Sequence, residues 1–172
     1  MVCIKIGFSK KKDRRVDVVT LQNTTEPKVK KSIMVLSFIS IALVFSTMLV
    51  GRYLSSTIDE KGLACSSWPL CPNGFGLPEG RYLTEYVHRL LAVVTTSFVY
   101  ATAIAVPSSL RKAKFASVIA SVVVSIQIIL GYFTVTTGLY PLIVAAHLST
   151  GITVFAFGLI TFLWIGILKR YW

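Results

Sequence analysis

The sequence predicts an all-α integral membrane protein, built as a four-helix transmembrane bundle with both termini in the cytoplasm. Of the 172 residues, 54% are hydrophobic and 15% are charged, whereas about a quarter of the residues of an average soluble domain are charged. The charges also gather in a few clusters between long apolar runs. Composition and patterning together argue against a soluble enzyme of ordinary design and indicate a bilayer environment.

Four stretches are long enough to cross a membrane. A transmembrane helix needs roughly 20 mostly apolar residues, and the chain offers such stretches at about 32–54, 83–106, 113–136 and 141–168. The first is too long for a secretory signal, and no compact small-residue cleavage site follows it. We therefore expect all four to be retained as helical spans.

The orientation follows from the distribution of lysine and arginine, which stay preferentially on the cytoplasmic side during insertion. Fourteen of them fall on one side of the predicted spans, and Arg52, Lys61 and Arg81 fall on the other. The sequence thus predicts a multi-pass protein of the cell membrane whose loop 55–82 is extracytoplasmic.

The chain is expected to divide into a basic cytoplasmic tail, residues 1–31, and a membrane domain, residues 32–172. The tail is cationic and lacks helical periodicity, so we expect it to be disordered or to lie on the membrane surface. The net charge of +11 indicates anionic lipid as a partner. No basic stretch is interleaved with aromatic residues on a predicted element, so nucleic acid is not an expected partner.

Topology separates the three cysteines. Cys3 lies in the predicted cytoplasmic tail and is expected to be a free thiol. Cys65 and Cys71 lie in the outer loop, where the compartment permits a disulfide. The pair fits a structural staple or a redox-active pair that exchanges with a partner. A metal site lacks the further ligands that a tetrahedral set requires.

The two histidines of the chain, His88 and His147, both fall within predicted spans. Each lies roughly 8–9 Å from the outer end of its helix, and the two helices run in the same direction. A single intramembrane histidine is often a hydrogen-bonded core residue. Two at matched depth favour a cavity or a cofactor site, and neutral imidazole is a good ligand for iron.

Two charged residues near these histidines, Glu85 and Arg52, each have two possible roles. Glu85 precedes His88 by three residues and so shares its helix face; it is either an interfacial partner of Arg81 or Arg89, or a carboxylate directed into the cavity of His88. Arg52 ends the first span and either pairs with an anionic group such as a propionate or reaches the lipid headgroups.

Four motifs in order resemble the successive signatures of the haem A synthase family. They are GLACSSWPLC at 62–71, EYVHR at 85–89, LGYFTV at 130–135 and LYPLIVAAHL at 139–148. The resemblance covers about residues 50–151, with each motif in the expected membrane position.

The resemblance implies a membrane enzyme that oxidises the methyl group of haem O to the formyl group of haem A for terminal oxidases. By matching positions, His88 and His147 would ligate the haem iron, Glu85 would be catalytic, and Cys65 with Cys71 would form a disulfide. Arg89 matches the arginine that follows the family's histidine, and we hypothesise that it contacts a propionate, as Arg52 would. The haem concerned would be haem B as cofactor, haem O as substrate, or both.

Typical members resemble two such four-helix halves fused, and the present sequence resembles one half. It is therefore expected to form a homo-oligomer or to work with a single site, with haem O synthase and terminal oxidase subunits as further possible partners. Three other functions stay open: a non-enzymatic membrane haem-binding or electron-transfer protein, a membrane thiol-disulfide oxidoreductase, and a di-iron carboxylate protein built on Glu85 and His88.

Overall fold

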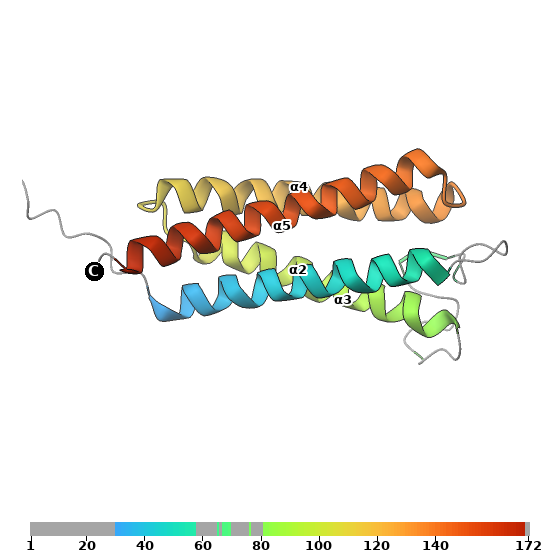
Figure 1. Cartoon of the computed structure of the whole chain (residues 1–172), viewed down its shortest axis with the longest axis horizontal. Coiled ribbons are helices and arrows are strands. Elements are labelled where there is room, and N and C mark those ends of the chain that lie inside the picture. Colours follow the sequence, from blue (N-terminus) through green and yellow to red (C-terminus); the bar gives the residue numbers. More distant parts are fainter. Residues whose placement is uncertain (1–29, 58–64, 66, 70–75, 77–80, 171–172) are drawn as a thin grey trace, which may run out of the picture.

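The computed structural model describes residues 30–57, 65, 67–69, 76 and 81–170. Its helices are α2 (Lys31–Thr57), α3 (Arg81–Ala105), α4 (Arg111–Thr136) and α5 (Pro141–Arg170), and no strand occurs among the described residues (Figure 1). All four are long and apolar enough to cross a membrane. The predicted all-α fold with four membrane-length helices is confirmed.

The helices differ from the predicted spans by up to three residues at their ends. Three of the four begin with a basic residue, Lys31, Arg81 or Arg111, that the apolar pattern had left outside. The helices continue past the apolar core because the backbone groups left unpaired at a helix end can bond to water or headgroups only at the polar interface. Most of the predicted tail lies outside the described residues, as do Cys3 and Cys71.

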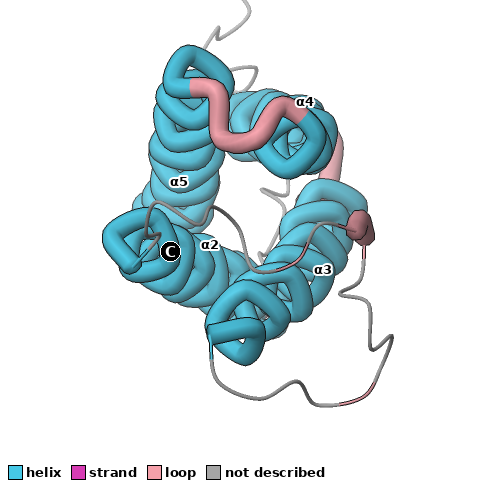
Figure 2. The backbone as a smooth tube through the Cα atoms, turned by 90° about the vertical axis from the view of Figure 1, so that its right-hand side faces the viewer, coloured by secondary structure: helices cyan, strands magenta, loops and turns pink. Residues whose placement is uncertain are grey.

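The helices form an antiparallel ring of four (Figure 2). Contacts join α2 to α3, α3 to α4, α4 to α5 and α5 to α2, and they are most extensive within the pairs α4–α5 and α2–α3. Helices α3 and α5 therefore face each other across the bundle. Both begin at the end where α2 and α4 finish (Figure 1), which we call the histidine end.

The interior is small and partly polar, while large apolar side chains point outward. One core cluster contains Val44, Val99, Ala120, Val124 and Val154. Only 17–22% of each apolar window is buried inside the bundle, so most of its side chains are left for lipid to cover. Small residues allow the close backbone approach that stabilises helix pairs in membranes.

Hydroxyl pairs join neighbouring helices within this core. The hydroxyls of Ser40 and Thr102 lie 2.7 Å apart, and those of Thr47 and Thr95 also lie 2.7 Å apart. Both pairs connect α2 with α3. Such interhelical hydrogen bonds contribute about 0.6 kcal/mol each on average in membrane proteins, and here they fix the register of the pair that carries His88.

A tight turn at the histidine end joins α4 to α5. Gly138 and Leu139 adopt positive φ values of 61° and 65°, and the Leu139 amide donates to the carbonyl of Thr134 at 3.0 Å. Glycine takes this conformation without a Cβ penalty, and Pro141 then starts α5, a position that suits its missing amide hydrogen. The turn thereby places His147 beside the last turns of α4.

Candidate functional site

His88 and His147 lie at the same level of the bundle, on the helices that face each other. His88 is the eighth residue of α3 and His147 the seventh of α5, which places them roughly 9–11 Å from the helix starts. The structure therefore brings together the two side chains that the sequence singled out.

Helix α2 packs its backbone directly against His88. A Cβ added at Gly51 would lie 2.8 Å from Cε1 of the imidazole, closer than real Cβ contacts come, and 3.3 Å from Nδ1. Gly51 thus gives His88 the space it occupies.

Helix α4 packs against His147 through Gly131. A Cβ at Gly131 would lie 3.5 Å from Cε1 of that imidazole, which is ordinary van der Waals contact. The ring also interacts with the backbone of Gln127, and the Gln127 side chain accepts a hydrogen bond from the Thr150 hydroxyl of α5. All four helices therefore contribute to the surroundings of the two histidines, which we call the histidine layer: Gly51, His88, Gly131 and His147.

The imidazoles carry the unsatisfied polar atoms of the described core. Nδ1 of His88 and Nδ1 of His147 are buried without a hydrogen-bond partner among the described residues. Leaving a buried polar group unpaired costs about 1–3 kcal/mol, and such groups usually mark a place for water, an ion or a ligand. Two imidazoles presented from opposed helices form the donor set that haem iron accepts, so the residues present fit a haem.

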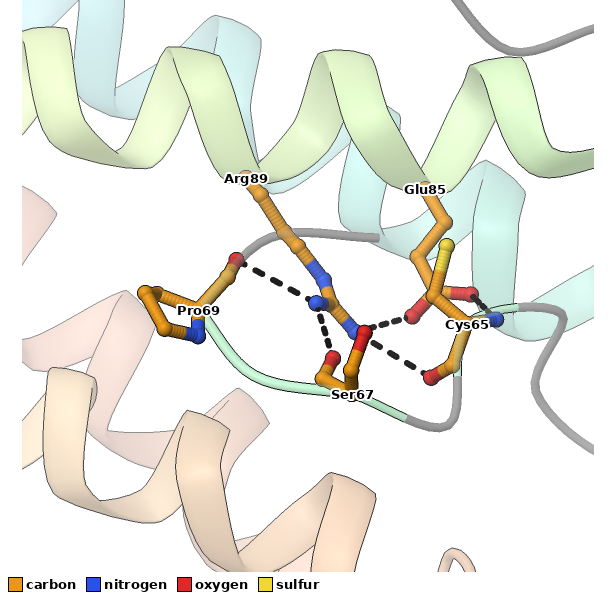
Figure 3. A network of polar contacts seen from close by, with 5 residues as sticks. All are labelled: Cys65, Ser67, Pro69, Glu85 and Arg89. Carbon is orange, nitrogen blue, oxygen red and sulfur yellow. Dashed lines mark hydrogen bonds and ion pairs between the residues drawn. The ribbon is translucent and has the colours of Figure 1, made fainter. Parts of the chain in front are cut away.

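Glu85 and Arg89 form a buried ion pair one turn apart on α3 (Figure 3). The Glu85 side chain is 2% exposed, and its Oε1 accepts from Arg89 at 2.5 Å. Its Oε2 accepts from the backbone amide of Cys65 at 3.0 Å. Of the two roles expected for Glu85, the structure shows the pairing with Arg89 and adds a bond to Cys65 in the loop between α2 and α3.

Arg89 contacts the loop between α2 and α3 through three backbone carbonyls. Its guanidinium donates to Ser67 at 2.5 Å, to Pro69 at 3.2 Å and to Cys65 at 3.3 Å. Sequence reasoning missed these contacts because every residue has a backbone carbonyl, so residue identity does not show which carbonyls Arg89 binds. The expected propionate contact stays a prediction.

Cys65 is fully buried and is disulfide-bonded. Cys71 lies outside the described residues, so the expected pairing with it stays a prediction. Trp68, from the same stretch, makes an edge-on ring contact with Tyr132 of α4, with ring centroids 5.5 Å apart. Tyr132 adjoins Gly131, so this part of the loop reaches α3 and α4 next to the histidine layer.

Arg52 lies at the histidine end but apart from this network. Its side chain is exposed and donates to the Ser55 hydroxyl at 3.0 Å. Both of its expected roles, a propionate contact and a contact with lipid headgroups, remain open to it.

A small cavity lies within the bundle core, among residues of the cluster that contains Val44 and Val99. Its volume is about 20 Å³, enough for a single water molecule. Hydroxyls from all four helices line it: Ser37, Ser40, Thr102, Ser117 and Thr161. The described residues form no group of three or more His, Cys, Asp and Glu side chains, so a di-iron site gains no support from them.

Sequence reasoning also missed Gly51 and Gln127. A glutamine within an apolar span is a detectable signal, because polar side chains in membranes seek partners on other helices. Gly51 gave no such signal, since its role depends on α2 packing beside α3.

Residues 77–170 match the family described as "Cytochrome oxidase assembly protein" (COX15-CtaA). The match covers more than half of the chain. The chain belongs to this family. The resemblance to haem A synthases carried by the four motifs is thereby confirmed, and it places two histidine-bearing helices, α3 and α5, inside the matched region.

Two curated relatives extend the comparison. A protein named heme A synthase, from Macrococcus caseolyticus (strain JCSC5402), is 29% identical over 142 residues, which are 78% of this chain and 44% of that protein. A protein named protoheme IX farnesyltransferase, from Haloarcula marismortui, is 30% identical over 123 residues, which are 67% of this chain and 26% of that protein. The chain spans less than half the length of either relative.

Proposed function

We propose that the chain is a membrane haem A synthase that oxidises the methyl group of haem O to the formyl group of haem A. The observation that carries the proposal is the opposed pair of imidazoles, His88 and His147, each with a buried and unpartnered Nδ1. Family membership and the relative named heme A synthase support the choice of reaction. A bundle core is a usual place for a cofactor or substrate held by facing helices.

The proposed roles follow the contacts. His88 and His147 would hold the iron of haem O as substrate, and Gly51 keeps space for the His88 ring. When bound, the haem supplies the redox chemistry. With dioxygen as oxidant the reaction balances as R–CH3 + O2 → R–CHO + H2O, so the methyl group is oxidised and dioxygen is reduced to water.

Glu85 supplies the fixed negative charge of the site. Its carboxylate is buried and held by two bonds, so it needs no reorganisation during the reaction. A carboxylate beside the reacting methyl group stabilises positive charge that develops as the carbon is oxidised. Arg52, which is exposed at the histidine end, would pair with a propionate.

The proposed partners rest on the relatives and on charge. The relative named for protoheme IX farnesyl transfer supports haem O synthase as the source of the substrate, and terminal oxidase subunits would receive the product. We also propose a homo-oligomer in the cell membrane, with loop 55–82 extracytoplasmic and the basic residues against anionic lipid.

Pigment analysis tests the proposal. The chain is co-expressed with a haem O synthase in a host that lacks haem A, purified, and its haem extracted and identified by chromatography and mass. The proposal predicts a Soret band and conversion of haem O to haem A, with both lost in the variant that carries His88→Ala and His147→Ala. Bound haem with no conversion would instead show a non-enzymatic haem protein, and absence of a Soret band would exclude both functions.

The thiol-disulfide alternative receives less support. A cysteine that exchanges with a partner must be reachable by a second thiol, and Cys65 is 0% exposed. Its burial favours the structural staple among the roles expected from the sequence.

A further inference from the structure

Arg89 binds the outer loop and the buried carboxylate at once (Figure 3). One terminal nitrogen of its guanidinium donates to the carbonyls of Ser67 and Pro69. The other donates to the carbonyl of Cys65 and to Glu85 Oε1. Both terminal nitrogens are therefore engaged within the protein.

Cys65 is the point where these contacts converge. Its amide donates to Glu85 Oε2, and its carbonyl accepts from Arg89. Both sides of one loop residue are thus bonded to the same ion pair on α3. Any displacement of the loop at Cys65 would break bonds to Glu85 as well as to Arg89.

The geometry requires arginine. A guanidinium offers five donors in a planar fork, so it can serve three carbonyls and a carboxylate together. A lysine ammonium could balance the charge of Glu85, but its three donors leave from a single atom and its shape does not match this set. The Arg89 side chain is 13% exposed, so water replaces little of what is lost.

We propose that Arg89 is a positioning residue: it docks the described loop residues, Cys65 and 67–69, on α3 and thereby fixes the Glu85 carboxylate beside the histidine layer. This inference rests on the proposed function, in which Glu85 acts on the substrate. In this role Arg89 does not make the expected propionate contact, because its guanidinium already donates to four acceptors. Trp68, packed on Tyr132, anchors the same residues to α4.

The accessibility of the Cys65 disulfide measures the docking. Cys65 is fully buried, so a water-soluble reductant reaches its Sγ only after the loop opens locally, and the rate of attack at that sulfur follows the population of the open form. The full chain, in a Cys3→Ser background, is treated with a phosphine reductant, and freed thiols are counted by maleimide mass labelling. The variants are Arg89→Gln and Arg89→Lys, with Arg111→Gln at the opposite end as the matched control.

The proposal predicts slow reduction in the parent protein and in Arg111→Gln. Arg89→Gln is expected to accelerate reduction by roughly tenfold or more, since several buried bonds are lost, with Arg89→Lys in between. A parent disulfide that is reduced as fast as in the detergent-unfolded chain would show that the loop is not docked, whatever the variants do. Parent-like rates in both Arg89 variants would also overturn the proposal.

A second readout separates positioning from a propionate contact. If Arg89 acts through Glu85, Arg89→Lys lowers kcat for haem O oxidation while KM for haem O changes by less than about twofold. A propionate ligand would instead raise KM and leave the disulfide as protected as in the parent. Should the parent protein make no haem A, the proposed function fails, while the reduction rates still test the docking of the loop.

Discussion

The imidazole of His88 lies so close to α2 that a Cβ at Gly51 would stand 2.8 Å from its Cε1. On the facing side of the bundle, a Cβ at Gly131 would lie 3.5 Å from Cε1 of His147. The two glycines thus lie in corresponding places beside the two histidines. Only at Gly51 would a Cβ overlap the space that the histidine ring occupies.

This difference predicts unequal effects of one added methyl group. Gly51→Ala forces the His88 ring to move, at a typical cost of about 1–3 kcal/mol, so we expect weaker haem binding and a shifted Soret band. Gly131→Ala is the matched control, and its haem affinity and Soret band should equal those of the parent within error. Haem titration followed by absorption measures the two variants, and equal effects would contradict the packing described for α2 and α3.

Glu85→Gln tests the charge of the buried carboxylate. Glutamine keeps the size of the side chain and an oxygen that can accept from the Cys65 amide, but it removes the negative charge that faces Arg89. We expect haem to stay bound while haem O conversion falls by roughly 10²-fold or more, as for the loss of one preorganised electrostatic group. Haem A formation at the parental rate would leave Glu85 with only its structural role as the partner of Arg89.

The sidedness of the bundle is predicted from the excess of lysine and arginine on one side. Reporter fusions after Lys112 and at the C-terminus should score as cytoplasmic, and one after Asn73 as external. The start of α2 and the end of α5 lie at the same end of the bundle (Figure 1), so the two termini should score on the same side of the membrane. An external score at Lys112 would invert the orientation and place the histidine layer near the cytoplasm.

The fold followed from the sequence because a single physical rule dominates it. A backbone in lipid must satisfy its own hydrogen bonds, so a run of about 20 apolar residues becomes a helix. The same rule placed His88 and His147 at matched depth, since position along a helix converts directly into distance. The structure extended the helices by up to three residues, for example into Lys31 and Arg111 at their starts and to Thr57 at the end of α2.

Contacts between elements could not be derived in this way. The sequence identified Glu85 and Arg89 as neighbours on one helix, but not the loop carbonyls that Arg89 binds, because those are backbone groups common to every residue. Gly51 was missed for a related reason: its significance depends on which face of α2 meets α3. Periodicity predicts elements, whereas these contacts depend on packing and loop path.

The proposed function depends most directly on whether His88 and His147 hold one haem iron together. Purified protein loaded with one equivalent of haem is measured by absorption and by electron paramagnetic resonance, alongside His88→Ala and His147→Ala. Two imidazole ligands predict a low-spin iron in the parent protein and conversion to high spin in each single variant. A parent-like low-spin signal in both single variants would show that the iron is held elsewhere, and the central claim would be wrong.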